Sequence, residues 1–290
     1  MLIPVCVWQY RRLIIVRRTS ESAMRKLLAV LAVALTLPML AGCSGGSGKQ
    51  DDNVLTVAAT AVPHAEILKQ VKPLLAKEGV DLQVKVFADY VQPNTQVAEK
   101  NIDLNYFQTK PYLDAFNRQR GTHLTIITGV HIEPFGAYSR KYKSIDQLPD
   151  GASVTIPNDP SNNSRALLLL ARHGLITLKD PNDQTSTLKD ITANPKHLKF
   201  RELEAAMLPR TLDEVDLSLI NTNYALAAGL NPTRDALLIE DKDSPYVNYL
   251  VGRPDNQHDP RVQKLAKALT SPEIRAFIEK KYHGAVLPAF

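Results

Sequence analysis

Hydrophobic and polar positions beyond residue 52 repeat with two alternating periods, which predict strands and helices in turn. The apolar, β-branched run at 54–61 predicts a buried strand. Apolar residues recur at helical spacing over 64–78, and Gly79 ends the predicted helix. Polar and apolar residues then alternate over 81–87, which predicts a second strand. This order predicts a parallel, right-handed βαβ unit.

The same pattern continues to the C-terminus and predicts an α/β protein. We expect further helices at 94–100, 110–120, 162–173, 261–269 and 272–282, and further strands at 124–132, 153–157, 198–203, 217–221, 237–240 and 246–252. A body of about 240 residues is large for one doubly wound sheet. We therefore expect two α/β lobes with a cleft between them.

The N-terminal residues have the pattern of a targeting sequence. Met24, Arg25 and Lys26 precede an apolar run at 27–40, which is too short to span a membrane as a helix. We therefore predict that residues 24–42 are a signal peptide. Residues 1–23 fit poorly before such a peptide, so we interpret them as an upstream extension and leave them out of the fold.

Cys43 follows Leu40, Ala41 and Gly42, which is the lipobox pattern of bacterial lipoproteins. The resemblance implies cleavage before Cys43 and lipid attachment to it. We expect 43–52 to be the lipidated cysteine and a flexible tether, because Gly and Ser follow the cysteine directly. The alternative is a buried N-terminal helix with a chance cysteine.

The net charge of +5 and the pI near 9.1 suggest a nucleic-acid or membrane partner. Residues 1–42 hold six of the 35 basic side chains and one of the 30 acidic ones, so 43–290 are neutral. A basic footprint for nucleic acid is therefore not supported for the mature part. Two cysteines, at positions 6 and 43, also exclude a disulfide scaffold for the body.

Sequence motifs of the common enzyme classes are absent. The chain has no Gly-x-Ser-x-Gly elbow, no His-Glu-x-x-His helix, no phosphate-binding loop and no cysteine pair for zinc. His131 and Glu133 alternate on one strand face and are candidate metal ligands. The alternative reading is a histidine at a strand end and a carboxylate in a loop. A tethered, neutral α/β body of this kind indicates capture of a small molecule more than catalysis.

Four segments carry polar and aromatic residues that packing alone does not require. They are 89–94, 101–113, 156–167, and 219–225 with 243–248 downstream. With 62–67, 133–139 and 202–210, they closely resemble the methionine-binding lipoprotein family (MetQ/NlpA type), the receptor component of a methionine ABC importer. The resemblance runs from about residue 54 to residue 290 and includes the lipobox.

The resemblance implies a type II periplasmic-binding-protein fold, with two α/β lobes joined by two crossover segments and a ligand cleft between them. We expect 53–131 and 249–290 to form the first lobe, and 132–248 to form the second.

Arg165 begins a predicted helix after a turn rich in Asn and Ser. A helix N-terminus favours an anion, and a guanidinium can pair with a carboxylate through two hydrogen bonds. We therefore assign Arg165 to the ligand carboxylate, as in the family. The alternative is an arginine that caps its own loop through Asp159.

The resemblance also places polar ligand contacts at Asn162, Asn221 and Asn248. Their amides can accept from an ammonium or donate to a carboxylate. The alternative for each is a turn residue that bonds its own backbone.

Tyr90 and Phe107 match the family's aromatic wall around a thioether, and sulfur on ring edges is favourable by about 0.3–1.5 kcal/mol. The alternative is that either ring belongs to the core. We also count Thr109 and Glu133 as ligand-binding. The family commonly has His where this chain has Thr109, and some members have Tyr where it has Glu133.

The resemblance implies a lipid-anchored receptor of the cell envelope that passes L-methionine to an ABC permease with its ATPase. We expect a monomer with no enzymatic activity, no cofactor and no nucleic-acid partner. Alternatives are a receptor for another methionine form, a short peptide or another amino acid, and a metal receptor using His64, His131 and Glu133. A surface protein that stabilises the transporter without importing its own ligand is a further alternative.

Overall fold

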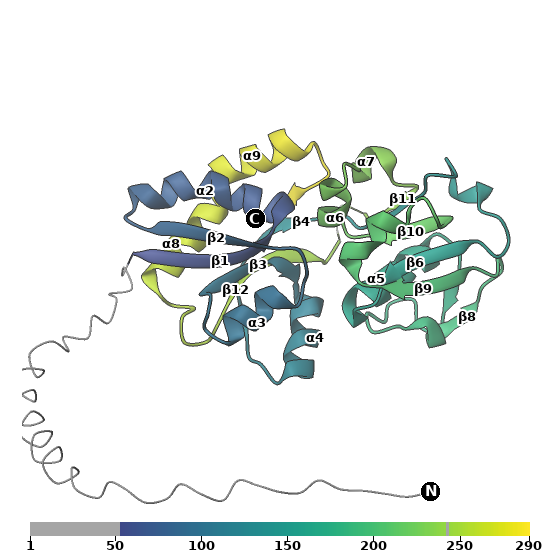
Figure 1. The fold of residues 1–290 in the computed structure, drawn as a ribbon, viewed down its shortest axis with the longest axis horizontal. Helices are drawn as coiled ribbons and strands as arrows, with labels where there is room; N and C mark the ends of the chain where they lie inside the picture. The colour runs from purple at the N-terminus through teal and green to yellow at the C-terminus, as the bar shows by residue number, and fades with distance from the viewer. Residues whose placement is uncertain (1–52, 242–243) are drawn as a thin grey trace, which may run out of the picture. The chain divides into compact units, whose positions relative to one another are not determined.

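The computed structural model describes residues 53–241 and 244–290, where two separate β-sheets organise the chain (Figure 1). The upstream extension, the signal peptide, Cys43 and the tether lie outside the described residues. Among the residues that are described, no helix has both the length and the apolar character to cross a membrane.

The first sheet is formed by six strands of the described chain in the order β13-β4-β12-β3-β1-β2. They are β1 (Val54–Thr60), β2 (Asp81–Phe87), β3 (Leu104–Thr109), β4 (Thr125–Ile132), β12 (Val247–Gly252) and β13 (Leu287–Pro288). β1 runs parallel to β2 and β3, whereas β12 is antiparallel to β3 and β4. The predicted βαβ unit at the start of the body is confirmed.

β1 is buried on both sides because helices cover both faces of the first sheet. Leu55 and Val57 of β1 pack with the apolar sides of α2 (Glu66–Lys77), α8 (Pro260–Leu269) and α9 (Pro272–Tyr282). Ala58 points the other way, toward α3 (Gln92–Ala98) and α4 (Lys110–Arg120). The short helical segment η1 (Ala61–Ala65) leads from β1 into α2.

The second sheet has the order β11-β5-β10-β6-β9 and its own core. Its strands are β5 (Gly136–Tyr138), β6 (Ser153–Pro157), β9 (Lys199–Leu203), β10 (Leu217–Ile220) and β11 (Leu238–Ile239). Around it lie η2 (Ile145–Gln147), α5 (Pro160–Arg172), the β7 (Thr177–Leu178) and β8 (Ile191–Ala193) pair, η3 (Leu188–Asp190), η4 (Ala205–Thr211), α6 (Thr222–Ala227) and α7 (Pro232–Asp235). The predicted α/β architecture is confirmed.

The chain passes between the two sheets at two places, after β4 and before β12. Ile132 and Val247 are register partners across these strands, and Asn248 pairs with His131. Ile132, Val247 and Asn248 were expected in the second lobe but are paired in the first sheet, because the crossover segments begin as strands of that sheet.

The sequence pattern did not predict β3, although β3 is a central strand. All six of its residues are buried, and Asn105 and Gln108 interrupt the apolar run. These amides bond to Asn94 of α3, with Asn105 Nδ2 donating to Asn94 Oδ1 at 2.8 Å and Gln108 Nε2 to the same oxygen at 2.6 Å. A strand with buried polar groups is stable here because the amides satisfy one another.

Candidate functional site

A small cavity of about 20 Å³, roughly the room that one water molecule needs, lies where the first sheet faces the second. Its lining comprises Tyr90, Phe107, Gln108, Thr109, Tyr112, Glu133, Asn162, Arg165, Asn221, Thr222, Asn223 and Asn248. All eight residues proposed from the sequence as ligand-binding are in this lining. The structure therefore brings them together, while their contact with a ligand stays a prediction.

Arg165 lies in the first turns of α5 and is 4% exposed. Its Nε donates to Glu240 Oε1 at 2.7 Å and its Nη2 to Glu240 Oε2 at 2.5 Å, which is a bidentate ion pair. Nη2 also donates to the backbone oxygen of Glu133 at 2.9 Å. In the described part of the chain Nη1 has no hydrogen bond, and Arg165 is one of the residues that line the cavity.

Two rings hold the guanidinium from its faces. The Arg165 Cζ lies 4.2 Å from the Tyr246 ring centroid and 5.2 Å from that of Phe135. Such contacts favour a cation, most strongly where water is excluded. The alternative role, in which Arg165 caps its own loop through Asp159, is wrong, because the partner of Arg165 is Glu240.

A chain of amides connects Asp159 to the cavity. Asp159 is the N-cap of α5 and accepts from the backbone N–H of Asn162 at 2.9 Å. The Asn162 side chain donates its Nδ2 to both Asp159 oxygens, at 3.1 and 3.0 Å, and its Oδ1 accepts from Asn221 Nδ2 at 2.8 Å. The Asn221 Oδ1 is buried and has no hydrogen-bond partner in the described residues. A buried acceptor without a donor is costly, so this oxygen is suited to a donor in the cavity.

Asn248 lies on β12, and its amide is oriented by His64. His64 Nε2 is 3.0 Å from Asn248 Oδ1 and 3.3 Å from Glu133 Oε1, while its Nδ1 is 2.7 Å from Thr60 Oγ1. Because both neighbours of Nε2 are oxygens, Nε2 carries the proton and donates. The Asn248 Nδ2 then remains as a donor on the lining. None of the three asparagines bonds its own backbone, so the turn-residue alternative is not supported.

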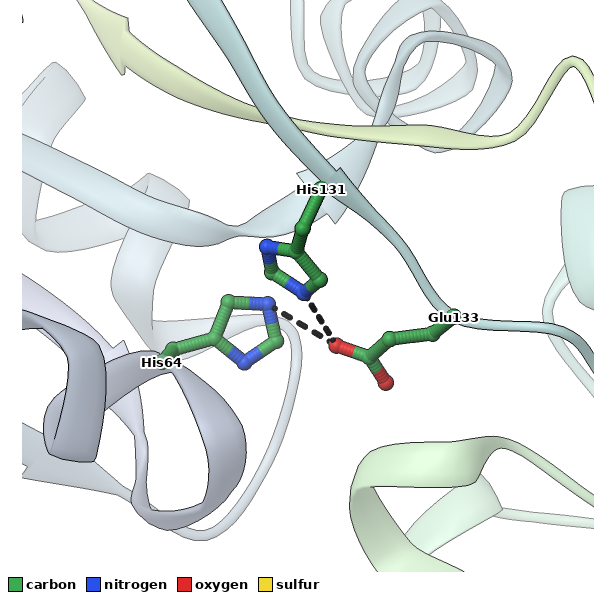
Figure 2. Close-up of side chains that lie close together, drawn as sticks. All are labelled: His64, His131 and Glu133. Atoms are coloured by element: carbon green, nitrogen blue, oxygen red, sulfur yellow. Dashed lines mark hydrogen bonds and ion pairs between the residues drawn. The ribbon is translucent and has the colours of Figure 1, made fainter. Parts of the chain in front are cut away.

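His131 and His64 both point their Nε2 atoms at one oxygen of Glu133, as Figure 2 shows. The His131 distance is 2.8 Å, and all three side chains are buried. Burial lowers the pKa of His64 to about 4 and that of His131 to about 3, so both rings are neutral at pH 7. Burial also raises the pKa of Glu133, and the positive charge of Arg165 opposes that rise.

These three residues also have the spacing of a metal site, since their ligand atoms lie within 4.8 Å of one another. The second nitrogen of His131 argues against this use. Nδ1 contacts the hydroxyl of Tyr106, which is fully buried and has no other hydrogen-bond partner in the part of the chain described here. The Tyr106 hydroxyl must donate to Nδ1, so the proton of His131 is on Nε2, which faces Glu133. The geometry thus favours a proton between His131 and Glu133 over a metal ion.

Aromatic rings close one side of the cavity. Tyr90 lies 5.7 Å from Phe107 and 5.6 Å from Tyr112 between ring centroids, and Phe107 lies 5.8 Å from Tyr112. Thr109 ends β3 beside them and is buried. Phe107 belongs to β3 and lines the cavity, so it is not an ordinary core residue.

Two tyrosines bridge the lobes next to the cavity. The Tyr90 hydroxyl donates to Asn223 Oδ1 at 2.6 Å, and the Tyr224 hydroxyl donates to the backbone oxygen of Ala88 at 2.9 Å. The rings of Tyr90 and Tyr224 are 5.0 Å apart between centroids. The lobes are therefore held together at the mouth of the cavity.

The sequence did not identify several residues of the site. Asn223 and Tyr246 stood within the polar segments, but only the structure gives them partners. Gln108 and Tyr112 also stood within a polar segment, but the sequence predicted no role for them. Glu240 follows a short strand and carries no signal in the sequence, although it holds Arg165.

Comparisons with known proteins agree on one family. The sequence profile of the NlpA lipoprotein family matches residues 55–290. The D-methionine-binding lipoprotein MetQ of Escherichia coli K12 is 40% identical over 266 residues, which cover 90% of this chain and 97% of that protein. The methionine-binding lipoprotein MetQ of Bacillus subtilis is 40% identical over 271 residues, covering 91% and 99%.

A comparison with solved structures also finds a similar methionine-binding protein. A nutrient binding protein from Burkholderia cenocepacia, bound to methionine, superposes with a TM-score of 0.79 at 44% identity. The match covers 81% of this chain and all of that one.

Proposed function

The chain belongs to the NlpA lipoprotein family, and on this basis we propose that it is a lipid-anchored receptor that binds a free amino acid, with L-methionine preferred, and delivers it to an ABC importer. It has the type II periplasmic-binding-protein fold of the methionine-binding structures that it resembles. The proposal includes the eight ligand-binding residues expected from the sequence and the two expected lobes, with Ile132, Val247 and Asn248 assigned to the first lobe.

The observation that carries the proposal is the pattern of donors and acceptors left open on the cavity wall. Arg165 Nη1 and Asn248 Nδ2 are donors suited to a carboxylate. Asn221 Oδ1 and the Glu133 carboxylate are acceptors suited to an ammonium. A free amino acid offers both groups on one carbon, and a peptide or a metal ion does not.

The aromatic side of the cavity suits the rest of the ligand. Tyr90, Phe107 and Tyr112 present ring edges and faces, and a thioether gains about 0.3–1.5 kcal/mol from such contacts. We therefore expect methionine to bind more tightly than norleucine, in which a methylene replaces the sulfur.

Calorimetry on residues 51–290 tests the proposal. The protein is unfolded, dialysed to remove any bound amino acid, and refolded, and then L-methionine, D-methionine, norleucine and Gly-Met are titrated separately. We expect L-methionine to bind with a Kd on the order of micromolar or below. A cooperatively folded sample that binds none of these ligands would contradict the proposal. Repeating the titration after dialysis against a chelator tests the metal alternative, and we expect an unchanged Kd.

The anchor and the delivery step need separate experiments. A Cys43→Ala variant should leave the detergent phase of fractionated cells, because the proposed lipid would be missing. An Arg165→Ala variant should lose methionine uptake while the importer still assembles. Uptake by that variant would instead favour a protein that stabilises the transporter. We propose no catalytic activity, since the relatives are named as binding proteins.

A further inference from the structure

We propose that Asp159 is a positioning residue that turns the amide oxygen of Asn221 toward the ligand, and that it thereby selects ligands with a protonated amine. The inference rests on the proposed function, an amino-acid receptor. Asp159 is not part of the cavity lining, and it acts through Asn162.

The first step fixes the amide of Asn162. Both oxygens of the Asp159 carboxylate lie within 3.1 Å of Asn162 Nδ2, and a carboxylate only accepts. The NH₂ group of Asn162 must therefore face Asp159. Its Oδ1 consequently faces the opposite way, toward Asn221.

The second step fixes the amide of Asn221. Because Asn162 presents an oxygen, Asn221 must present its NH₂ group, and the two atoms are 2.8 Å apart. The Asn221 Oδ1 is then the last atom of this series of hydrogen-bonded side chains and has no partner within it. Asn221 is the N-cap residue of α6, yet its side chain makes no capping hydrogen bond, so this oxygen has no structural use in the helix. It is buried without a donor in the described residues, and a ligand ammonium supplies one.

A simpler role for Asp159 is the N-cap of α5, where it accepts from the backbone N–H of Asn162. Asn caps a helix about as well as Asp, so an Asp159→Asn variant keeps this role. It places an NH₂ group opposite the NH₂ group of Asn162, at an atom pair that is now 3.0 Å apart. We then expect the side-chain amide of Asn162 to exchange the positions of its oxygen and its NH₂ group, and the amide of Asn221 to do the same. The cavity would then receive a hydrogen-bond donor from Asn221 where it had an acceptor.

The test compares two ligands that differ only in the amine. Calorimetry gives the Kd of L-methionine and of 4-(methylthio)butanoic acid, which lacks the amino group, for wild type and for Asp159→Asn. We expect methionine to bind about tenfold to a hundredfold more weakly to the variant, as for an unpaired buried polar group. The desamino ligand should change by less than about threefold, because it has no ammonium to lose.

A double variant deliberately reverses the direction of the hydrogen bond between residues 162 and 221. In Asp159→Asn with Asn221→Asp, the turned Asn162 donates to the new carboxylate, which still accepts from an ammonium. This variant should recover most of the methionine affinity. Asp259→Asn is the control, since Asp259 is the N-cap of α8, where it accepts from the backbone N–H of Arg261, and does not line the cavity; it should leave both Kd values unchanged.

Equal weakening of both ligands by Asp159→Asn would overturn the inference and assign Asp159 to the helix cap alone. An unchanged methionine Kd, or no recovery in the double variant, would overturn it as well. If wild type binds neither ligand, the amino-acid proposal itself fails, and the two failures are therefore distinguishable.

Discussion

Arg165 combines a structural and a recognition role in one buried side chain. Two of its nitrogens pair with Glu240, and the third has no hydrogen bond in the described residues and is proposed to meet the ligand carboxylate. Removal of one partner of a buried pair leaves an uncompensated charge and costs about 3–5 kcal/mol, whereas removal of both costs much less.

The two roles of Arg165 can be separated by mutation. Arg165→Met should lower the free energy of unfolding by about 3–5 kcal/mol, because Glu240 stays buried without its partner. Arg165→Met with Glu240→Gln should recover most of this stability and still fail to bind methionine. Urea unfolding and calorimetry measure the two effects. Methionine binding by the double variant would remove Arg165 from the ligand site.

The two buried histidines predict how stability depends on pH. They stay neutral in the folded protein down to pKa values of about 4 for His64 and about 3 for His131, because burial disfavours their charged forms. In the unfolded chain each takes a proton near pH 6.5. Between pH 6.5 and about 4 the unfolded state therefore binds more protons. The free energy of unfolding should fall in this window, by up to about 1.4 kcal/mol per pH unit for each histidine.

Urea unfolding at pH 7.5, 6.5, 5.5 and 4.5 measures this dependence. Glu133 and Asp159 act in the opposite sense, because burial raises their pKa values and the folded state takes up their protons first. A His131→Gln variant isolates the contribution of one histidine, and its stability should fall less steeply below pH 6.5. An unchanged slope would contradict the assignment of His131 as a neutral ring.

Sequence reasoning identified side chains that face the cavity better than those that hold them in place. Asn162, Asn221 and Asn248 could be predicted because they stand in polar segments that resemble the methionine-binding lipoprotein family, and the resemblance places ligand contacts at these positions. Glu240 could not, because one acidic residue after a short strand looks like any exposed carboxylate. Its role depends on the distance to Arg165, which is 75 positions away in the chain.

At the scale of elements, α5 connects the site to the core of the second lobe. Its first turns carry Asn162 and Arg165 into the cavity, and Leu167–Leu170 behind them are all buried. Residues 161–170 of α5 are all buried, so this stretch of the helix is enclosed on all sides. The position of the guanidinium thus depends on tight packing several residues away.

Leu167→Ala tests this dependence. Leu167 is fully buried in the second core, and such a substitution typically costs 2–5 kcal/mol. We expect a lower melting temperature and, because α5 can shift into the space, a weaker affinity for methionine. Ala171→Gly, on the same helix but only partly buried, is the control for helix propensity and should cost about 1 kcal/mol. A loss of stability as small as that of the control would contradict the packing argument.

Most elements could be predicted from the sequence, because apolar residues set their period. The helix at 110–120 and the strands at 81–87 and 153–157 were predicted with the observed bounds. β3 could not be predicted, since Asn105 and Gln108 make it look like a loop. Their burial is possible only because Asn94 of α3 lies against them, and such a contact is not visible in the order of residues.

At the scale of the whole molecule, the two lobes meet through tyrosines next to the cavity. A ligand that stabilises the closed form should be held partly by these contacts. Tyr224→Phe keeps the ring against Tyr90 and removes the hydrogen bond to Ala88.

We expect Tyr224→Phe to raise the Kd of methionine about twofold to tenfold, the value of one hydrogen bond, without a comparable loss of stability. Calorimetry gives the Kd, and small-angle scattering with and without methionine reports closure. Tyr142→Phe, in the second lobe away from the cavity, is the control. A variant with wild-type affinity would mean that the bridge does not contribute to closure.

The pairing of Ile132 with Val247 has a consequence for how the protein can be divided. The chain leaves and re-enters the first sheet at one point, so the second lobe is an insert in what is otherwise a hairpin of β4 and β12. A two-residue turn can join such neighbours. Excision of 133–246 and closure with Asn-Gly should leave a single-lobed module, and the same junction would accept a second lobe from another receptor as an exchangeable cassette.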